Sequence, residues 1–483
     1  MKIRIRKLLS VLLLAFLLVI GSLFAYLFID LDKPHYAPDI QSNIINDITQ
    51  LNPIEVTRVI APTKLATIVK GIKDSSGRIS IGGGRFSQGG QVAIENSIHF
   101  DMRTFNRVLE LDITNKQVTV QSGITWRDLL AVIDPHNLSV KIMQTYANFT
   151  VGGSLSVNVH GRYIGEGPII RSVDSIKLVL ADGRVVLASA SQNAALFYAA
   201  IGGYGGIGVI AEVTLNLADN IKVKRFTETM DVNAYGRFFK ESISSDESII
   251  FHNADIYPPK FSELRSVSWK MSEDELTQKQ KLIAKNKSYK WQPKVAEFVA
   301  DSDFGKWTRQ HILEPILYSF SAVQWRNYEA SYDVYELEPK SRVKQTYALR
   351  EYFVPIDKFD NFLLQMTDIF KKHQVNVINV SVRHALPDSG SLLAWAKTEV
   401  FAFVIYYRQE NSTEAQDKVE LWSREIVDAV IEQGGTYYLP YQLHATTAQF
   451  LKAYPNADEF FQVKKSVDPD NRFMNKLWAQ HFH

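Results

Sequence analysis

The chain has 483 residues, 46% of them hydrophobic and 22% charged, which is the composition of a globular protein too long for one ordinary hydrophobic core. The formal net charge of +2 at pH 7 argues against a dedicated nucleic-acid binder. There is no cysteine, which excludes disulfides, thiolate metal sites, a cysteine nucleophile and a cysteinyl bond to a cofactor.

The first expected element is an apolar helix at residues 8–29, a run of 22 residues without a charge that follows four basic residues. At about 1.5 Å per residue it would span roughly 33 Å, enough to cross a bilayer. The basic flank should stay cytoplasmic, which places the remaining chain on the non-cytoplasmic side. A signal peptide cleaved near Ala25 is the alternative. We therefore predict a basic flank and single-pass membrane anchor at 1–33 and a polar tether at 34–51.

Residues 52–220 read as an α+β domain. Its expected elements are a helix at 62–72, strands at 79–82 and 117–120, a helix at 125–133 capped by Thr125, a hairpin at 175–187, a helix at 194–200 and a strand at 208–217. The hairpin carries an Asp-Gly turn at 182–183.

Residues 221–437 show longer strands and longer amphipathic helices, which predict a larger sheet covered by helices. Strands are expected at 350–355 and 400–407, and helices at 355–372 and 413–432. The lysine-rich stretch 274–294 reads as a solvated helix or loop. The last segment, 438–483, is expected to return to the first domain.

Three glycine clusters lie in the first domain, each beside a β-rich segment. The first reads Gly-Gly-Gly-Arg-Phe-Ser-Gln-Gly-Gly-Gln at 82–91, the second Thr-Val-Gly-Gly-Ser at 150–154 and the third Gly-Gly-Tyr-Gly-Gly-Ile-Gly at 202–208. Successive N–H groups in such turns form concave nests that bind phosphate oxygens. The third cluster formally fits G-x-G-x-x-G, but a Rossmann fingerprint needs a strand before it and a helix after it. The expected order here is the reverse, which excludes a nicotinamide-binding fold.

The order of these motifs resembles the FAD-binding PCMH-type (vanillyl-alcohol oxidase / p-cresol methylhydroxylase) flavoprotein oxidoreductases. Within that family the chain is most similar to cytokinin dehydrogenases, decaprenylphosphoryl-ribose oxidases and sugar-lactone oxidases. Further matching motifs are His160-Gly161 and, near the end, Tyr-Leu-Pro-Tyr at 438–441 and Phe-Met-Asn at 473–475. The resemblance implies an α+β fold in two domains, with FAD between a cofactor domain and a larger sheet-and-helix substrate domain, and with residues 438–483 returning to the flavin.

Carried over residue by residue, the resemblance implies three groups of FAD contacts. They are Gly82, Gly83, Gly84, Arg85, Phe86 and Ser87 at the pyrophosphate, Val151, Gly152, Gly153, Ser154, Asn158 and His160 at the flavin, and Gly203, Gly208 and Ile210 at the adenine and ribose. In many relatives a histidine is joined covalently to the flavin. Laid without a gap on residues 85–91, that histidine falls on Phe86, so we predict FAD without a covalent bond.

The known catalytic groups of these relatives are not retained. The aspartate base of cytokinin dehydrogenases falls on Thr145, and the active-site lysine of the decaprenyl-sugar oxidases falls near Tyr441, so neither substrate can be carried over. Candidates for catalysis are Tyr441 and His444, after a Leu-Pro turn, and Glu351 and Arg383 on the expected sheet are candidates for substrate contact. The 11 histidines show no spacing typical of metal ligands.

The sequence thus predicts a membrane-anchored, FAD-dependent oxidoreductase that transfers a hydride from an alcohol or amine C–H to flavin N5. Its partners would be a small-molecule substrate, the membrane, and O₂ or a membrane quinone as electron acceptor. Two alternatives stay open: a flavin-dependent reductase of the same superfamily, and a flavin-binding membrane protein without catalysis.

Overall fold

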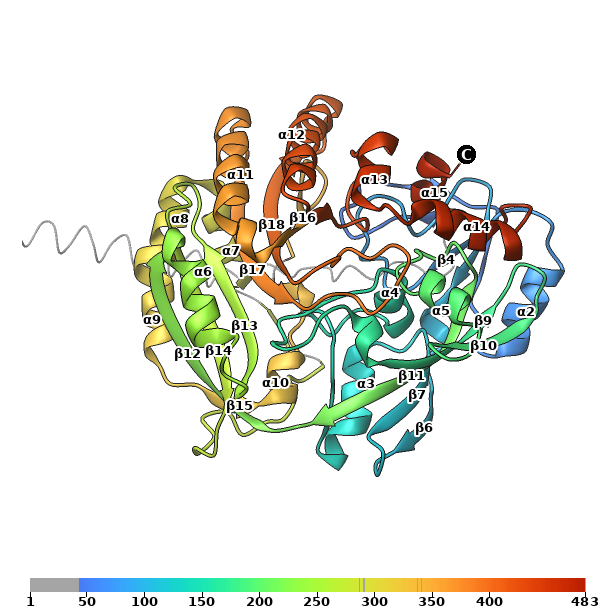
Figure 1. Ribbon diagram of the computed structural model, residues 1–483, viewed down its shortest axis with the longest axis horizontal. Coiled ribbons are helices and arrows are strands. Elements are labelled where there is room, and N and C mark those ends of the chain that lie inside the picture. Colours follow the sequence, from blue (N-terminus) through green and yellow to red (C-terminus); the bar gives the residue numbers. More distant parts are fainter. Residues whose placement is uncertain (1–42, 286, 290–291, 337, 340, 483) are drawn as a thin grey trace, which may run out of the picture.

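The computed structural model describes residues 43–285, 287–289, 292–336, 338–339 and 341–482. The expected membrane anchor and the first half of the tether, residues 34–42, lie outside these residues. Within them, no helix is both long enough and apolar enough to cross a membrane. The fold is mixed α+β, with a sheet-rich second half beside the first (Figure 1), as the sequence predicts.

The first half contains three small sheets. Their strands are β1 (Ile44–Ile45), β2 (Ile54–Glu55), β3 (Arg58–Ile60), β4 (Ile79–Gly82), β5 (Ile98–Asp101), β6 (Val108–Asp112), β7 (Gln117–Gln121), β8 (Leu138–Val140), β9 (Val173–Val179), β10 (Val185–Ser189) and β11 (Val209–Asp219). Strands β3, β5 and β4 pair in parallel, whereas β10-β9-β11-β7-β6 form an antiparallel sheet to which β8 adds through β11. Strand β4 of the short parallel sheet ends at Gly82, the first residue of the first glycine cluster.

The helices of the first half are α2 (Leu65–Lys73), α3 (Trp126–Ile133), α4 (Val151–Ser156) and α5 (Ala194–Ala200). Helix α3 begins as predicted, because the Thr125 side chain accepts a hydrogen bond from the Asp128 N–H. Helix α2 begins three residues later than expected, after Lys64, whose side chain makes no capping hydrogen bond. The 175–187 hairpin is also confirmed as β9 and β10, with Gly183 at φ +80° in the turn.

The second half is built on one antiparallel sheet in the order β15-β12-β14-β13-β17-β18-β16-β19. Its strands are β12 (Lys222–Asp231), β13 (Ile249–Ile256), β14 (Glu263–Met271), β15 (Val323–Trp325), β16 (Gln345–Pro355), β17 (Val377–Ala385), β18 (Val400–Glu410) and β19 (Thr436–Tyr437). Its helices are α6 (Tyr235–Phe238), α7 (Gln292–Asp301), α8 (Asp303–Thr308), α9 (Glu314–Ser319), α10 (Arg326–Ala330), α11 (Phe359–His373) and α12 (Thr413–Glu432).

Helices α11 and α12 cover one face of this sheet (Figure 1), and aromatic side chains fill the space between them. Phe359 of α11 stacks on Phe403 of β18 with ring centroids 5.3 Å apart. Trp422 of α12 meets Tyr407 of β18 edge to face at 5.1 Å. Helix α11 starts at Phe359 rather than at the predicted 355, because a 3₁₀ turn at Ile356–Lys358 follows Pro355.

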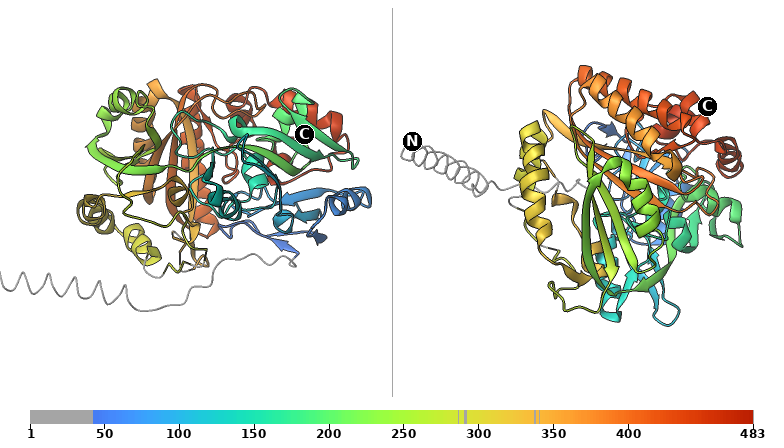
Figure 2. Two further views of the ribbon diagram at one scale, coloured as in Figure 1. Left: turned by 90° about the horizontal axis from the view of Figure 1, so that it is seen from below. Right: turned by 60° about the vertical axis from the view of Figure 1, so that its left-hand side comes forward.

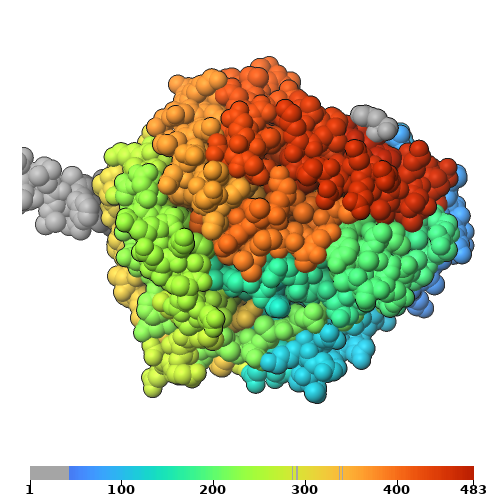
Figure 3. Space-filling view, in the orientation of Figure 1, coloured from blue at the N-terminus to red at the C-terminus, as the bar shows by residue number. Residues whose placement is uncertain are grey.

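The C-terminal segment packs back on the first half through α13 (Thr447–Ala453), α14 (Ala457–Val467) and α15 (Lys476–His481) (Figure 3). The buried Lys464 pairs with Asp468 at 2.7 Å and donates to the carbonyl of Gly206 at 3.0 Å. The Trp478 indole donates to the carbonyl of Gly203 at 3.2 Å. The end of the chain therefore supports the third glycine cluster.

Candidate active site

The three glycine clusters meet in space. A Cβ atom on Gly83 would lie 2.2 Å from Thr150 Oγ1, the atom that caps α4 by accepting from the Gly153 N–H. The N–H of Gly202 donates to the carbonyl of Leu155 at 3.0 Å, which joins the third cluster to α4. Glycine at position 83 is therefore required by the close approach of the first two clusters to each other.

The first cluster presents free main-chain donors. The N–H groups of Gly84, Phe86 and Ser87 bond to no acceptor among the described residues, and these three residues are partly exposed. Arg85 has φ +60°, and its buried guanidinium bonds Asp101 at 2.8 Å, beneath the loop. Any contact of Arg85 with a phosphate would thus come from its main chain, and the loop has the form of an anion-binding nest.

Buried polar atoms without a partner lie around the same clusters. His99 Nε2, beside Gly82, and Ser122 Oγ, beside Gly152, have no hydrogen-bond partner among the described residues. Burial lowers the pKa of His99 to about 3, so its ring is neutral at ordinary pH. Thr145 Oγ1 likewise has no partner in the part of the chain that the structure describes. A dinucleotide offers phosphate, ribose and ring atoms to such groups, so these residues fit FAD.

Several of the predicted FAD contacts have side chains engaged within the protein. Ser154 accepts from the Trp126 indole at 2.9 Å, and Asn158, at φ +51°, donates to Asp388 at 2.7 Å. The side chains of Val151 and Ile210 are buried in the hydrophobic core. Gly203 and Gly208 face the carbonyls of Ala199 and Val179. For this group the predicted contacts with FAD remain predictions, and they would be made mainly by main-chain atoms.

A buried polar group joins the first half to the large sheet. His160, which follows α4, contacts Glu351 Oε1 of β16 through Nε2. The Tyr441 hydroxyl donates to Glu351 Oε2 at 3.0 Å. The His160 ring is packed by Trp395 at 4.9 Å and by Phe353 at 5.5 Å between centroids. Three distant chain segments thus meet at one carboxylate.

The charges in this group follow from its hydrogen bonds. Burial raises the pKa of Glu351, but His160, Arg383 and the hydrogen bond from Tyr441 together outweigh it, so the pKa of this carboxyl is lowered overall. Both ring nitrogens of His160 face oxygen atoms, Glu351 Oε1 on one side and the carbonyl of Gly161 at 3.3 Å on the other. Burial, together with Glu351, raises the pKa of Tyr441 well above its ordinary value, so the phenol is a donor.

Arg383 on β17 is a partly buried cation near this group. Its guanidinium makes no hydrogen bond with the described residues, and its Nε is buried without a partner among them. Burial lowers the pKa of Arg383 while Glu351 raises it, and an arginine stays charged in either case. An enclosed guanidinium of this kind is a binding group for an oxygen-rich ligand.

His444 is separated from this group. Arg350 and Glu351 are successive residues of β16, so their side chains point to opposite faces of the sheet. His444 bonds Arg350 and therefore lies on the face away from Glu351. Burial, Arg350 and Arg424 lower the pKa of His444 to about 2, which leaves a neutral ring without access to the Tyr441 hydroxyl.

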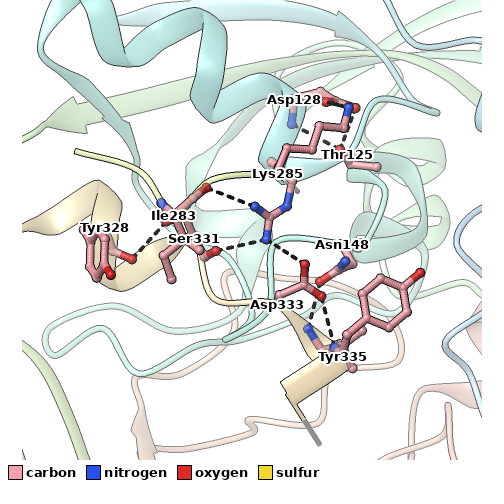
Figure 4. A network of polar contacts seen from close by, with 11 residues as sticks. Thr125, Asp128, Asn148, Ile283, Lys285, Tyr328, Ser331, Asp333 and Tyr335 are labelled. Atoms are coloured by element: carbon pink, nitrogen blue, oxygen red, sulfur yellow. Dashed lines mark hydrogen bonds and ion pairs between the residues drawn. The ribbon is translucent and has the colours of Figure 1, made fainter. Parts of the chain in front are cut away.

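Two largely buried arginines, Arg162 and Arg127, belong to none of the sequence motifs. Arg162 pairs with the buried Glu329 at 2.7 Å. Arg162 lies two residues after His160 in a segment that forms no strand, and no sequence pattern singles it out. Arg127 of α3 donates to the carbonyls of Ile283 and Ser331 and to Asp333 at 3.1–3.2 Å (Figure 4).

The Arg127 contacts hold the loop that leads into α4. Asn148 accepts from the Val334 N–H at 2.9 Å (Figure 4), and the Ala147 N–H donates to the carbonyl of Tyr332 at 2.9 Å. The segment at 331–334 and the loop at 144–149 are thus tied together across the two halves.

The glycine clusters converge and present main-chain N–H groups without acceptors among the described residues, and His160, Glu351 and Tyr441 form a polar group between the two halves. These are the features of a flavoprotein oxidoreductase. Residues 56–189 match the model of an FAD binding domain, and residues 214–482 match the model of the D-arabinono-1,4-lactone oxidase family. Because the second match spans more than half of the chain, the protein belongs to the D-arabinono-1,4-lactone oxidase family. It is an FAD-dependent oxidoreductase of the sugar-lactone oxidase and dehydrogenase type, as the PCMH-type resemblance predicts.

Two relatives match most of the chain at low identity, and a third matches a shorter part of it. L-gulonolactone oxidase of Mus musculus is 23% identical over 418 residues, which cover 83% of this chain and 89% of the relative. Decaprenylphosphoryl-beta-D-ribose oxidase of Mycolicibacterium smegmatis is 23% identical over 472 residues, 91% of this chain and 94% of the relative. Mitochondrial L-galactono-1,4-lactone dehydrogenase of Arabidopsis thaliana is 28% identical over 185 residues, 38% and 30% of the two chains.

Proposed function

We propose that the protein oxidises an alcohol carbon of a polyhydroxylated, sugar-type substrate. The observation that carries the proposal is Glu351, whose two carboxylate oxygens are bonded by His160 and Tyr441 near the partly buried Arg383. The relatives act on sugar lactones or on decaprenylphosphoryl-beta-D-ribose, as their names state. They favour an alcohol over the amine that the sequence leaves open.

FAD supplies the hydride acceptor, and the protein has to hold the substrate and take its hydroxyl proton. Tyr441 accepts that proton on its phenol oxygen while its own proton moves to Glu351 at 3.0 Å. Glu351 is then neutral and remains in contact with His160.

Arg383 positions the substrate. Its guanidinium N–H groups donate to substrate oxygen atoms, which turns the reacting carbon toward Tyr441. FAD is held without a covalent bond, with its pyrophosphate on the N–H groups of residues 84–87.

Residues 8–29 anchor the protein in a membrane and place the catalytic part on its non-cytoplasmic side, with O₂ or a membrane quinone as electron acceptor. The uncharged run and its basic flank support this topology. Protease added outside the membrane should cleave after Lys33, and protection of the whole catalytic part would contradict the orientation.

The function is tested by mixing the purified yellow protein, without oxygen, with a panel of sugar lactones, aldoses and alditols. Bleaching of the flavin by one of them is expected. Bleaching only by a chemical reductant, followed by reoxidation with an enol or alkene, would indicate a reductase instead, and no turnover in either direction would indicate a binding protein.

Tyr441→Phe then tests the proton path, because it deletes only the hydroxyl. Flavin reduction should slow by about 10²-fold or more while FAD stays bound. Tyr437→Phe is the matched control, since the Tyr437 hydroxyl is buried in the same segment without a partner among the described residues. An unchanged rate in Tyr441→Phe would remove this residue from the mechanism.

A further inference from the structure

The helical segment 303–319 exposes most of its large apolar side chains and buries Lys306 and Glu314, while the charged Asp303 at its start is exposed. It consists of α8, a π-helical turn at Arg309–Leu313 and α9, and Phe320 follows it. Phe304, Ile316 and Phe320 are 64%, 58% and 68% exposed. Three more large apolar side chains on this segment are exposed, namely Trp307, Ile312 and Leu317. An ordinary surface helix has the opposite polarity.

The inward-facing charged side chains of the segment form hydrogen bonds and ion pairs within the protein. Lys306 is 7% exposed and bonds the Asn376 side chain at 2.9 Å. Arg309 bonds Glu314 at 2.6 Å, and Glu314 also accepts from the Tyr257 hydroxyl. These inward contacts fix which side of the helical segment points outward. The exposure of its apolar side chains therefore follows from how the segment packs.

The outward face carries no charge from residue 304 to residue 320. Its exposed members are Phe304, Trp307, His311, Ile312, Pro315, Ile316, Leu317, Ser319 and Phe320. The polar member His311 lies flat on the Trp307 ring, with centroids 4.9 Å apart. A contiguous apolar patch of this kind marks an interaction surface. We call these residues the apolar face.

The chain that precedes the described residues indicates what covers the apolar face. Only 13 residues, 30–42, separate the end of the uncharged run from Asn43, and they reach at most about 45 Å when extended. Helices α7–α9, in yellow, and the first described residues, in blue, lie along the same lower side of the molecule in the left view of Figure 2. A tether of this length keeps that side close to the bilayer.

We propose that the apolar face lies in the interfacial layer of the membrane to which the protein is anchored, with Phe304, Trp307 and Ile316 among the lipid tails near the headgroups. The proposal rests on the anchor proposed above. Aromatic and aliphatic side chains on an uncharged helical face are suited to this layer. Because no charge takes part, the contact should need no anionic lipid and should resist high salt.

The absence of cysteine from the whole chain allows a direct test. Ile316→Cys, in the full-length protein on phosphatidylcholine vesicles, is labelled with a polarity-sensitive nitrobenzoxadiazole dye. The dye emission should shift to the blue and should be quenched by lipids that carry a spin label near the headgroup. Leu187→Cys is the matched control, because Leu187 is 46% exposed on β10 of the other half and should give the emission of a dye in water.

A second experiment separates this contact from the anchor. A protease site inserted between residues 33 and 43 allows the catalytic part to be cut from the full-length protein on the vesicles. The cut part should stay bound at high salt, whereas the Phe304→Glu, Ile316→Glu double variant should be released with unchanged flavin reduction. Release of the uncut protein would show that the anchor itself is wrong.

Three results would overturn the proposal. They are release of the cut wild-type part, dye emission as in water at position 316, and a blue shift that spin-labelled lipid does not quench but that grows with protein density. The last of these would identify a second copy of the chain as the occupant of the apolar face.

Discussion

Replacement of Glu351 by glutamine removes one charge from the centre of the candidate site and keeps the shape of the side chain. Glu351 accepts one hydrogen bond from His160 and one from Tyr441. Hydrogen bonds to a charged group contribute about 1.5–3 kcal/mol each. If both are lost in the step that takes the substrate proton, the barrier rises by about 3–6 kcal/mol, and flavin reduction should slow by about 10²–10⁴-fold.

The assay is rapid anaerobic mixing of the FAD-loaded protein with its substrate, followed by flavin absorbance. Glu399→Gln is the matched control, because Glu399 pairs with His384 at 2.7 Å elsewhere on the same sheet. His384 follows Arg383 on β17, so it points to the face away from the site. Equal reduction rates in the two variants would refute the role given to Glu351.

Three further outcomes are expected. Gly83→Val should fold but lose FAD, because its side chain would displace Thr150. Gly77→Val is the control, because position 77 has open space around it, and this variant should keep FAD. A yellow Gly83→Val protein would contradict the prediction. Acid precipitation should release all flavin to the supernatant because Phe86 stands where relatives carry the linking histidine, and flavin in the pellet would show a covalent bond. Burial raises the pKa of Asp47 from 3.8 to about 6. As the pH rises from about 4 to about 6, the unfolded chain releases the Asp47 proton before the folded chain does, so the free energy of unfolding should fall by up to about 3 kcal/mol. Thermal release of FAD should show this slope, and Asp47→Asn should flatten it.

The first half of the fold could be predicted because its signals are local. Thr125 and Asp128 define the start of α3 within four residues, and the Asp-Gly turn defines a hairpin within two. The contacts of the candidate site are not local. His160 and Glu351 are 191 positions apart and Glu351 and Tyr441 are 90 apart, so their pairing depends on how the two halves pack.

Two features escaped prediction for identifiable reasons. His444 stands three residues after Tyr441, and only the register of β16 decides that Arg350 draws it to the opposite face. The segment 303–319 gave no expected helix, because the usual rule assumes that the apolar side of a helix faces inward. Here Lys306 and Glu314 face inward, so the periodic pattern is present but inverted.

The placement of the first glycine cluster has a consequence for the order in which the protein is made. The loop at 82–91 is synthesised early, yet the Gln88 N–H bonds the carbonyl of Pro440, and the Gln91 amide bonds the carbonyls of Leu439 and Tyr441. These partners leave the ribosome almost last. A chain that lacks residues 439–441 therefore cannot complete the hydrogen bonds of the loop at 82–91, and we expect it to capture no FAD. Chains truncated before residue 438 should remain colourless and sensitive to proteases even with the whole first half present.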